Sequence, residues 1–177
     1  MREVLDFWFK ELTPKDWWVK NLELDRLIEK RFLSTHQKAI AGELFSWRTT
    51  SEGRLAEIIV LDQFSRNIYR GKKESFLYDG MALVLAQECV HLKEDQKLEV
   101  QMRNFIYMPY MHSESLEIHN EALKLFDQVG LEDNLKFEHA HLDIIKRFGR
   151  YPHRNEILKR ESTKEEIEFL KQPNSSF

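Results

Sequence analysis

Hydrophobic residues recur along almost the whole chain at the three- and four-residue spacing of an α-helix, with polar residues between them. The first apolar stripe of this kind is formed by Leu5, Trp8, Phe9 and Leu12. The same spacing predicts further helices over residues 22–41, 51–70, 74–91, 96–108, 113–129 and 133–148, a short helix from Asn155 and a last one from Thr163. Because no segment shows a clear strand pattern, we expect an all-α fold of about eight helices.

Several residues mark where these helices begin and end. Ser51 suits the N-cap of its helix, and Thr163 followed three residues later by Glu166 matches a capping box. Pro109 is expected to end its helix because the proline ring cannot continue the hydrogen-bond ladder, and Gly149 to end its own as a C-terminal cap.

The domain organisation follows from the turn residues and the connections. Six Gly and four Pro in 177 residues are few for a fold built on many tight turns, which favours the all-α class. Short connections favour antiparallel helix pairs. We expect a single helical domain over residues 1–177, with residues 172–177 as a frayed tail.

Composition and charge narrow the function classes. The chain is 42% hydrophobic and 12% aromatic, too apolar for a disordered protein. With 27 basic against 30 acidic residues, it is not a strongly basic nucleic-acid binder. The lone Cys89 excludes an internal disulfide and a cysteine-based zinc site. No signal sequence or membrane span is recognised, so we expect a cytoplasmic protein without a membrane partner.

One helix carries charges on an apolar face. Asp62 and Arg66 fall on the same face as Leu55, Ile58 and Ile59, and the helix has a second apolar face as well. A helix that is apolar on more than one side is central and buried. The two charges are therefore expected to be at least half buried, where a charge is costly unless it is paired.

This helix permits two interpretations, because Gln63 and Asn67 form another polar pair four residues apart. The charges and amides could be a network that ties helices together. Alternatively, Arg66 and Asn67 could face a cleft in which cations gather with few counter-charges, alongside Arg150, Arg154 and His112.

The joint that follows Pro109 is the second unusual segment. His112, Ser113 and Glu114 stand where the next helix is expected to start, and free N–H groups at a helix start favour an anion. An ordinary helix start with Ser113 as N-cap explains Ser113 and Glu114. It does not explain His112, which could be a general acid or base, a ligand, or a surface residue.

The helix predicted over 133–148 carries three residues with possible chemistry. His141 falls on its apolar stripe, where a histidine is more often a hydrogen-bonded core residue than a ligand. His139 and Asp143 stand four residues apart and could touch a metal, but two ligands do not make a site. We predict no metal and no other cofactor.

The turn after Gly149 is rich in hydrogen-bonding cations. Pro152 fixes a loop that carries four polar side chains, those of Arg150, His153, Arg154 and Asn155. Arginine forks match carboxylate and phosphate groups, so the turn suits an anion. The same cations could instead cap the carbonyl groups of the preceding helix.

Three motifs, at Leu61–Asn67 (LDQFSRN), Tyr107–Glu114 (YMPYMHSE) and Phe148–Asn155 (FGRYPHRN), resemble a bacterial family catalogued as domain of unknown function nine hundred and twenty-four. The resemblance extends from Val4 to Phe169 and implies a tetratricopeptide-like fold of stacked antiparallel helix pairs. It carries over to Asp62, Gln63, Arg66, Asn67, Arg103, Pro109, His112, Ser113, Glu114, His141, Asp143, Gly149, Arg150, Pro152, His153, Arg154 and Asn155. The chain departs from the family at His119, where relatives usually carry Gln. The family has no assigned activity.

The function is therefore open between three hypotheses. The first is a binding module for an anionic small molecule or a peptide carboxylate, with ligand-binding residues Asp62, Gln63, Arg66, Asn67, Arg103, Ser113, Arg150, Arg154 and Asn155. The second is a small hydrolase or lyase, with catalytic residues His112, Glu114, His141, Asp143 and His153. The third is a purely structural polar network. The oligomeric state is not indicated by the sequence.

Overall fold

The computed structural model describes residues 1–173 and 175, and this part of the chain contains α-helices, short 3₁₀ helices and two π-helical turns but no strand. The α-helices are α1 (Arg2–Asp6), α2 (Leu22–Ile40), α3 (Ser51–Ile59), α4 (Ser65–Ile68), α5 (Asp79–His91), α6 (Val100–Met111), α7 (Leu116–Phe126), α8 (Glu132–Phe148) and α9 (Lys164–Leu170). The π-helical turn Val60–Phe64 joins α3 to α4 without a break, so these nine segments form eight rods in the described residues. The all-α prediction is confirmed.

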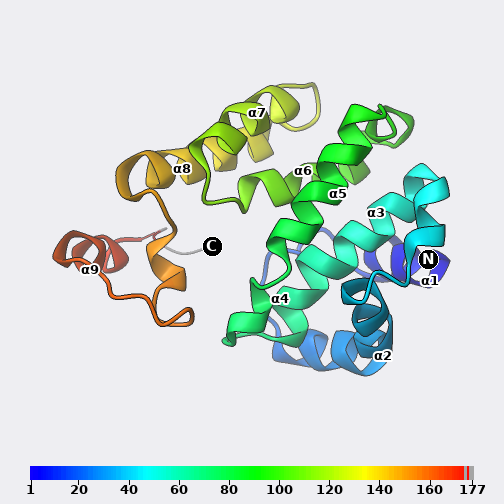
Figure 1. Cartoon of the computed structure of the whole chain (residues 1–177), viewed down its shortest axis with the longest axis horizontal. Coiled ribbons are helices and arrows are strands. Elements are labelled where there is room, and N and C mark those ends of the chain that lie inside the picture. Colours follow the sequence, from blue (N-terminus) through cyan, green and yellow to red (C-terminus); the bar gives the residue numbers. More distant parts are fainter. Residues whose placement is uncertain (174, 176–177) are drawn as a thin grey trace.

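Helices that follow one another in the chain pack side by side. Helix α5 packs on α6, α6 on α7 and α7 on α8, while α2 packs against α4 (Figure 1). Helix α3 contacts α1, α5 and α6, which places it at the centre. This arrangement is consistent with the expected antiparallel pairs, whereas the tetratricopeptide-like superhelix and the single domain stay predictions.

The main hydrophobic core surrounds the central rod. Leu55, Ile58, Ile59, Val60 and Phe64 are all completely buried there, as the two apolar faces of this helix predict. Ile144, Ile145 and Tyr151 form a smaller buried cluster that also packs against Phe148 and Phe169. The charged pair Asp62 and Arg66 therefore lies on the same rod as the centre of the main core.

Two predicted helix ends are wrong by a few residues. Thr50 rather than Ser51 is the N-cap of α3, because its side chain accepts a hydrogen bond from the N–H of Gly53. Pro109 does not end α6, which continues to Met111. A proline removes only its own N–H from the ladder, and the N–H of His112 still bonds to the carbonyl of Met108.

Three further helix starts lie elsewhere than expected. Helix α7 begins after Ser115 rather than at Ser113, whose hydroxyl accepts a hydrogen bond from the N–H of Ser115. Helix α5 begins at Asp79, after a 3₁₀ turn over Lys73–Ser75. No α-helix starts at Asn155, because its side chain bonds to neighbouring loop residues instead of capping a helix.

The C-terminal end is well defined as far as it is described. Thr163 and Glu166 form the predicted capping box at the start of α9. The expected frayed tail over residues 172–177 lies partly outside the described residues, namely at 174, 176 and 177. Within its described part, Ser175 is buried and its hydroxyl donates a hydrogen bond to the carbonyl of Leu170.

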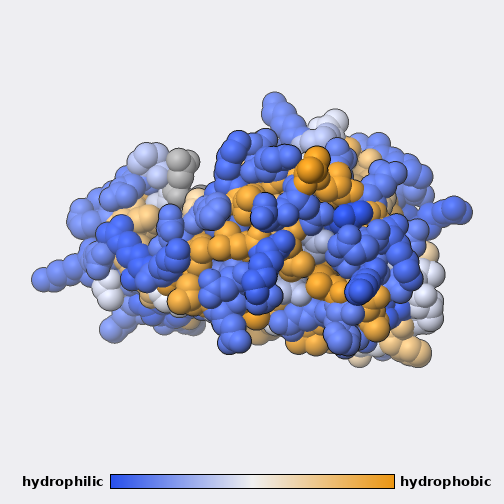
Figure 2. Space-filling model, turned by 90° about the horizontal axis from the view of Figure 1, so that it is seen from above, coloured by the Kyte–Doolittle hydropathy of each residue, from blue (hydrophilic) through white to orange (hydrophobic). Residues whose placement is uncertain are grey.

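The surface is mostly polar but not uniformly so. Figure 2 shows hydrophilic residues over much of one face, with hydrophobic residues in a band through its middle. Large hydrophobic side chains that stay exposed include Leu77, Met81 and Val84, in and just before α5. None of the helices in the described chain is long and apolar enough to cross a membrane.

Candidate functional site

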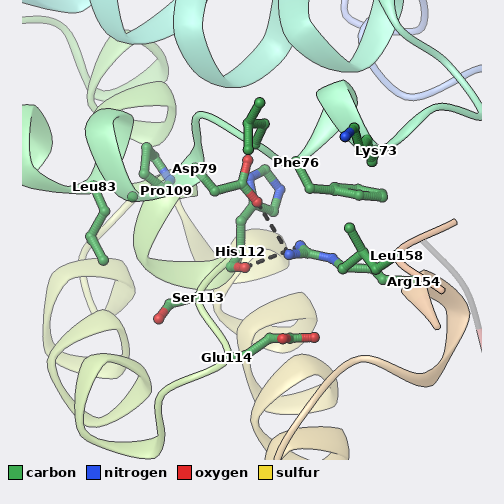
Figure 3. A pocket seen from close by; sticks show the side chains of 12 residues that line it. Lys73, Phe76, Asp79, Leu83, Pro109, His112, Ser113, Glu114, Arg154 and Leu158 are labelled. Carbon is green, nitrogen blue, oxygen red and sulfur yellow. Dashed lines mark hydrogen bonds and ion pairs between the residues drawn. The ribbon is translucent and has the colours of Figure 1, made fainter. Parts of the chain in front are cut away.

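Segments that are far apart in the sequence meet at an open cleft of about 400 Å³. They are the start of α5 with the turn before it, the end of α6, and the loop after α8. The apolar part of the wall is formed by Phe76, Leu77, Leu83, Pro109 and Leu158. The polar part is formed by Lys73, Asp79, His112, Ser113, Glu114 and Arg154, most of which Figure 3 shows around the opening.

Local backbone structure brings these segments together. Gly149, in the left-handed conformation with φ of 68°, ends α8 and turns the chain back toward α6. Tyr151 then fixes the loop, because its N–H donates to Glu114 at 2.8 Å and its hydroxyl donates to the carbonyl of Met111 at 2.5 Å. The following 3₁₀ turn, Pro152–Arg154, carries the Arg154 side chain to the cleft.

A paired cluster of four charges lies in and beneath this wall. The guanidinium of Arg66 contacts Asp62 at 3.0 Å and binds both oxygens of Asp79, at 2.9 and 3.0 Å. Arg154 donates to Asp79 at 3.1 Å and to the carbonyl of His112 at 3.0 Å (Figure 3). The side chain of Asp62 is 1% exposed and that of Arg66 19%, so the expected burial of both is confirmed.

The expectation of cations with few counter-charges is wrong. Asp62 and Asp79 together balance the charges of Arg66 and Arg154, and Arg150 lies elsewhere, on Glu166. Asp79 was missed because an acidic residue in the first turn of a helix is unremarkable in sequence. Its partners come from segments 13 and 75 residues away along the chain.

Two aromatic rings hold Arg154 in place. Its guanidinium carbon lies 4.5 Å from the centre of the Phe76 ring and 4.7 Å from that of Tyr151. A guanidinium between two ring faces gains cation–π attraction and loses conformational freedom. Arg154 is only 6% exposed, and its Nε atom is buried without a hydrogen-bond partner in the described chain.

His112 lines the cleft beside this charge cluster. Its Nδ1 lies 2.8 Å from Asp62 Oδ1, and its side chain is 11% exposed. Burial opposes ionisation of Asp62, but Arg66 and His112 outweigh it and hold the pKa of Asp62 below its usual value. Burial, reinforced by Arg66, lowers the pKa of His112 despite the attraction of Asp62. At neutral pH His112 is therefore neutral and donates from Nδ1 to an ionised Asp62.

Glu114 lines the cleft, but both of its carboxylate oxygens already accept hydrogen bonds from the protein. Its two oxygens accept hydrogen bonds from Arg160 at 2.6 and 2.9 Å, and one of them also accepts from the N–H of Tyr151. Burial opposes ionisation of Glu114, yet Arg160 and the Tyr151 N–H lower its pKa. Arg160 is a further residue that the motifs did not reveal, since it lies beyond the last of them.

Several predicted ligand-binding residues tie helices together instead. Asn67 donates to Asp25 of α2, and Gln63 donates to Asp62 rather than pairing with Asn67. The remaining three bond to residues away from the cleft. Arg103 binds Leu98, Gln96 and Gln128, Arg150 binds Glu166 and Glu161, and Asn155 binds Ser162 and Arg160.

The other predicted catalytic residues do not line the cleft either. His141 is buried and its Nδ1–H donates to the carbonyl of Phe137, while burial lowers its pKa to about 3. Burial and then Arg154 lower the pKa of His153 to about 4. The side chain of Asp143 is 77% exposed, near Lys146. Of the predicted catalytic set, only His112 and Glu114 line the cleft.

His119 has a structural position beneath the cleft. It is completely buried, with Nδ1 2.6 Å from Glu138 of α8 and Nε2 2.9 Å from the carbonyl of Ser113. It therefore links α7, α8 and the loop that carries His112. Within residues 1–173 and 175, no three His, Cys, Asp or Glu side chains gather closely enough to hold a metal ion.

Comparisons with known proteins identify relatives without a described activity. Residues 4–174 match the model of a family described as bacterial protein of unknown function (DUF924). A solved structure, that of the protein of unknown function ATU0120 from Agrobacterium tumefaciens, is 36% identical. The match covers 96% of this chain and 95% of that one, with a TM-score of 0.91. No curated protein is significantly similar to the chain.

Proposed function

Since the chain belongs to the DUF924 family, whose function is unknown, we propose from its cleft that it binds a small molecule with an apolar body and one anionic group. The observation that supports this proposal is that the start of α5 with the turn before it, the end of α6 and the loop after α8 converge on one cleft. Its volume of about 400 Å³ falls within the range of small-molecule sites. Its lining, apolar with a few polar groups, also has the usual composition of such sites.

The charges of the lining favour an anion over a cation. Both carboxylates of the lining are already held by guanidinium groups, Asp79 by Arg66 and Glu114 by Arg160. A cationic ligand would have to displace one of them. Lys73 is the lining residue whose charge has no ion-pair partner among the described residues. Its ammonium group can therefore pair with a carboxylate or phosphate while Phe76, Leu77 and Leu158 cover an apolar body.

The proposal is tested with simple probes in thermal melting at constant ionic strength. Phenylacetate and hexanoate are compared with their neutral amides and with inorganic phosphate. A probe at 100 times its dissociation constant adds about 2.7 kcal/mol to the stability. For a domain of this size that corresponds to roughly 5–11 °C in Tm. We expect the carboxylates to give larger shifts than the amides.

Two pairs of variants locate the binding. Lys73→Gln should reduce the carboxylate shift to that of the amide, whereas Lys72→Gln, exposed and outside the cleft, should leave it unchanged. Gly80→Leu should abolish both shifts by filling the cleft, because an added Cβ meets no atom within 4 Å there. Gly80→Ala is its control. Absence of any shift in the wild type, or an equal shift in Gly80→Leu, would contradict the proposal.

A further inference from the structure

The orientation of the His112 ring leaves one nitrogen available. Because Asp62 is ionised, the nitrogen that faces it must carry the hydrogen, which is Nδ1. The neutral ring therefore has its lone pair on Nε2. No hydrogen bond to Nε2 is found within the described chain, and His112 lines the cleft. A buried carboxylate, an oriented imidazole and a free nitrogen at a ligand-sized cleft form a base–orienter pair.

We propose that His112 is a general base, that Asp62 is its positioning residue, and that the substrate is a small carboxylic ester with an apolar acyl or alkyl part. This inference depends on the proposed function only in requiring that the cleft admits a ligand. An ester fits because its acyl carbon reacts with water once a base removes the proton of the water. The apolar wall formed by Phe76, Leu83 and Pro109 suits the hydrocarbon part of such a molecule.

The reaction needs only water as a second reactant. Nε2 of His112 accepts a proton from water as the water oxygen bonds to the acyl carbon, which produces a tetrahedral adduct. The adduct then expels the alcohol oxygen with its bonding electrons, and that oxygen takes the proton from Nε2. The products are a carboxylic acid and an alcohol, and His112 returns to its neutral form. Asp62 stabilises the transient imidazolium and keeps Nε2 directed to the cleft.

The charges around His112 favour the neutral ring that a base requires. Asp62 and Asp79 face it as carboxylates, and Arg66 as a cation. His141 and His153 also interact with it. Burial and Arg66 prevail, so the pKa of His112 lies below the ordinary value of 6.5. The ring consequently remains unprotonated throughout the neutral range, with the lone pair of Nε2 open to accept a proton.

The test is the hydrolysis of p-nitrophenyl acetate and p-nitrophenyl butyrate, which are uncharged and do not require Lys73. At pH 7.5 we expect a rate at least about tenfold above that of N-acetylhistidine at the same concentration. The rate should fall with decreasing pH around a midpoint below 6.5. His112→Asn retains a donor near the position of Nδ1 but has no base, and it should lose the excess rate. His91→Asn, at an exposed position of α5, is the matched control.

The role of Asp62 has its own measurement. Asp62→Asn should lower the rate and move the midpoint of the pH profile further down, because Asp62 raises the pKa of His112. Should this variant not fold, ¹⁵N NMR of the wild type still decides whether His112 carries its hydrogen on Nδ1. A hydrogen on Nε2, or a wild-type rate no higher than that of N-acetylhistidine, would overturn the inference. So would an undiminished rate in folded His112→Asn.

The two proposals fail separately. Loss of the carboxylate melting shift with retained, His112-dependent hydrolysis would refute anion binding and leave the general base standing. The reverse result would refute the general base alone.

Discussion

Replacing Asp79 with Asn removes the carboxylate that holds Arg66 and Arg154 together at the wall of the cleft. In the wild type, Asp79 accepts two hydrogen bonds from Arg66 and one from Arg154. The Asn side chain has the same size but no charge, and its amide group places a donor against one of these guanidinium groups. Asp62 then remains the counter-charge of Arg66, while Arg154 keeps only its bond to the carbonyl of His112 and the rings beside it.

The cost follows from the burial of this cluster. Breaking a buried ion pair by removing one partner costs about 3–5 kcal/mol. Asp79 is 15% exposed and Arg154 8%, so water compensates for a small part of the loss. We therefore expect the lower end of the range, about 3 kcal/mol. At about 2–4 °C per kcal/mol for a chain of this length, the melting temperature should fall by roughly 6–12 °C.

Urea unfolding followed by circular dichroism measures this difference directly. Asp143→Asn is the matched control, because its side chain is 77% exposed and such surface changes stay within about 0.5 kcal/mol. In Asp79→Asn the charge cluster around Arg66 and Arg154 has one more net positive charge than in the wild type. Because an anion can compensate this charge, sulfate at constant ionic strength should stabilise the variant more than the wild type. A loss below about 1 kcal/mol would refute the reasoning. It would mean that the three bonds to Asp79 contribute no more than surface contacts do.

Three further predictions concern other parts of the chain. Gly53→Ala should lower the free energy of unfolding by at least about 1–3 kcal/mol, because the added Cβ would lie 1.9 Å from the carbonyl oxygen of Trp47. Gly80→Ala, where an added Cβ meets no atom within 4 Å, should be neutral or slightly stabilising, and urea unfolding of the two variants measures the difference. Burial lowers the pKa of His36 to about 4, so the unfolded chain binds a proton that the folded chain does not. Between pH 7 and 5 this group alone reduces the free energy of unfolding by about 2 kcal/mol. Unfolding curves at each pH should therefore show a decrease about 2 kcal/mol smaller in His36→Phe than in the wild type, and the buried His141 and His153 account for part of the decrease that remains. Burial raises the pKa of the Cys89 thiol to about 12, so a thiol reagent should label it only after unfolding; rapid labelling of the native protein would contradict this.

Much of the fold could be predicted because helix formation depends on spacing within short segments. The three- and four-residue spacing of hydrophobic residues predicted the helices. The two apolar faces of the helix predicted over residues 51–70 predicted its central position and the burial of Asp62 and Arg66. The capping box at Thr163 was likewise local, since all its partners lie within three residues. The predicted helix end at Pro109 and the predicted helix start at Asn155 were wrong because hydrogen bonds to neighbouring residues outweighed the local preference.

The candidate site was predictable only in part. The motifs indicated His112, Ser113, Glu114 and Arg154, which do line the cleft. They equally indicated residues such as Asn67 and Arg150, which bind Asp25 and Glu166 at other places in the fold. No spacing rule separates a guanidinium that faces a cleft from one that ties two helices, because both positions require a polar residue next to apolar ones.

The sequence by itself determined the helices, the buried charged segment and the absence of a cysteine-based site, since each follows from residue types and their local spacing. Only the tertiary structure decided which charges are neutralised. Asp79 and Arg154 stand 75 residues apart and meet because Gly149 and Tyr151 turn the loop after α8 back onto the end of α6. Electrostatic interaction depends on distance in space and on burial, and neither can be read from position along the chain.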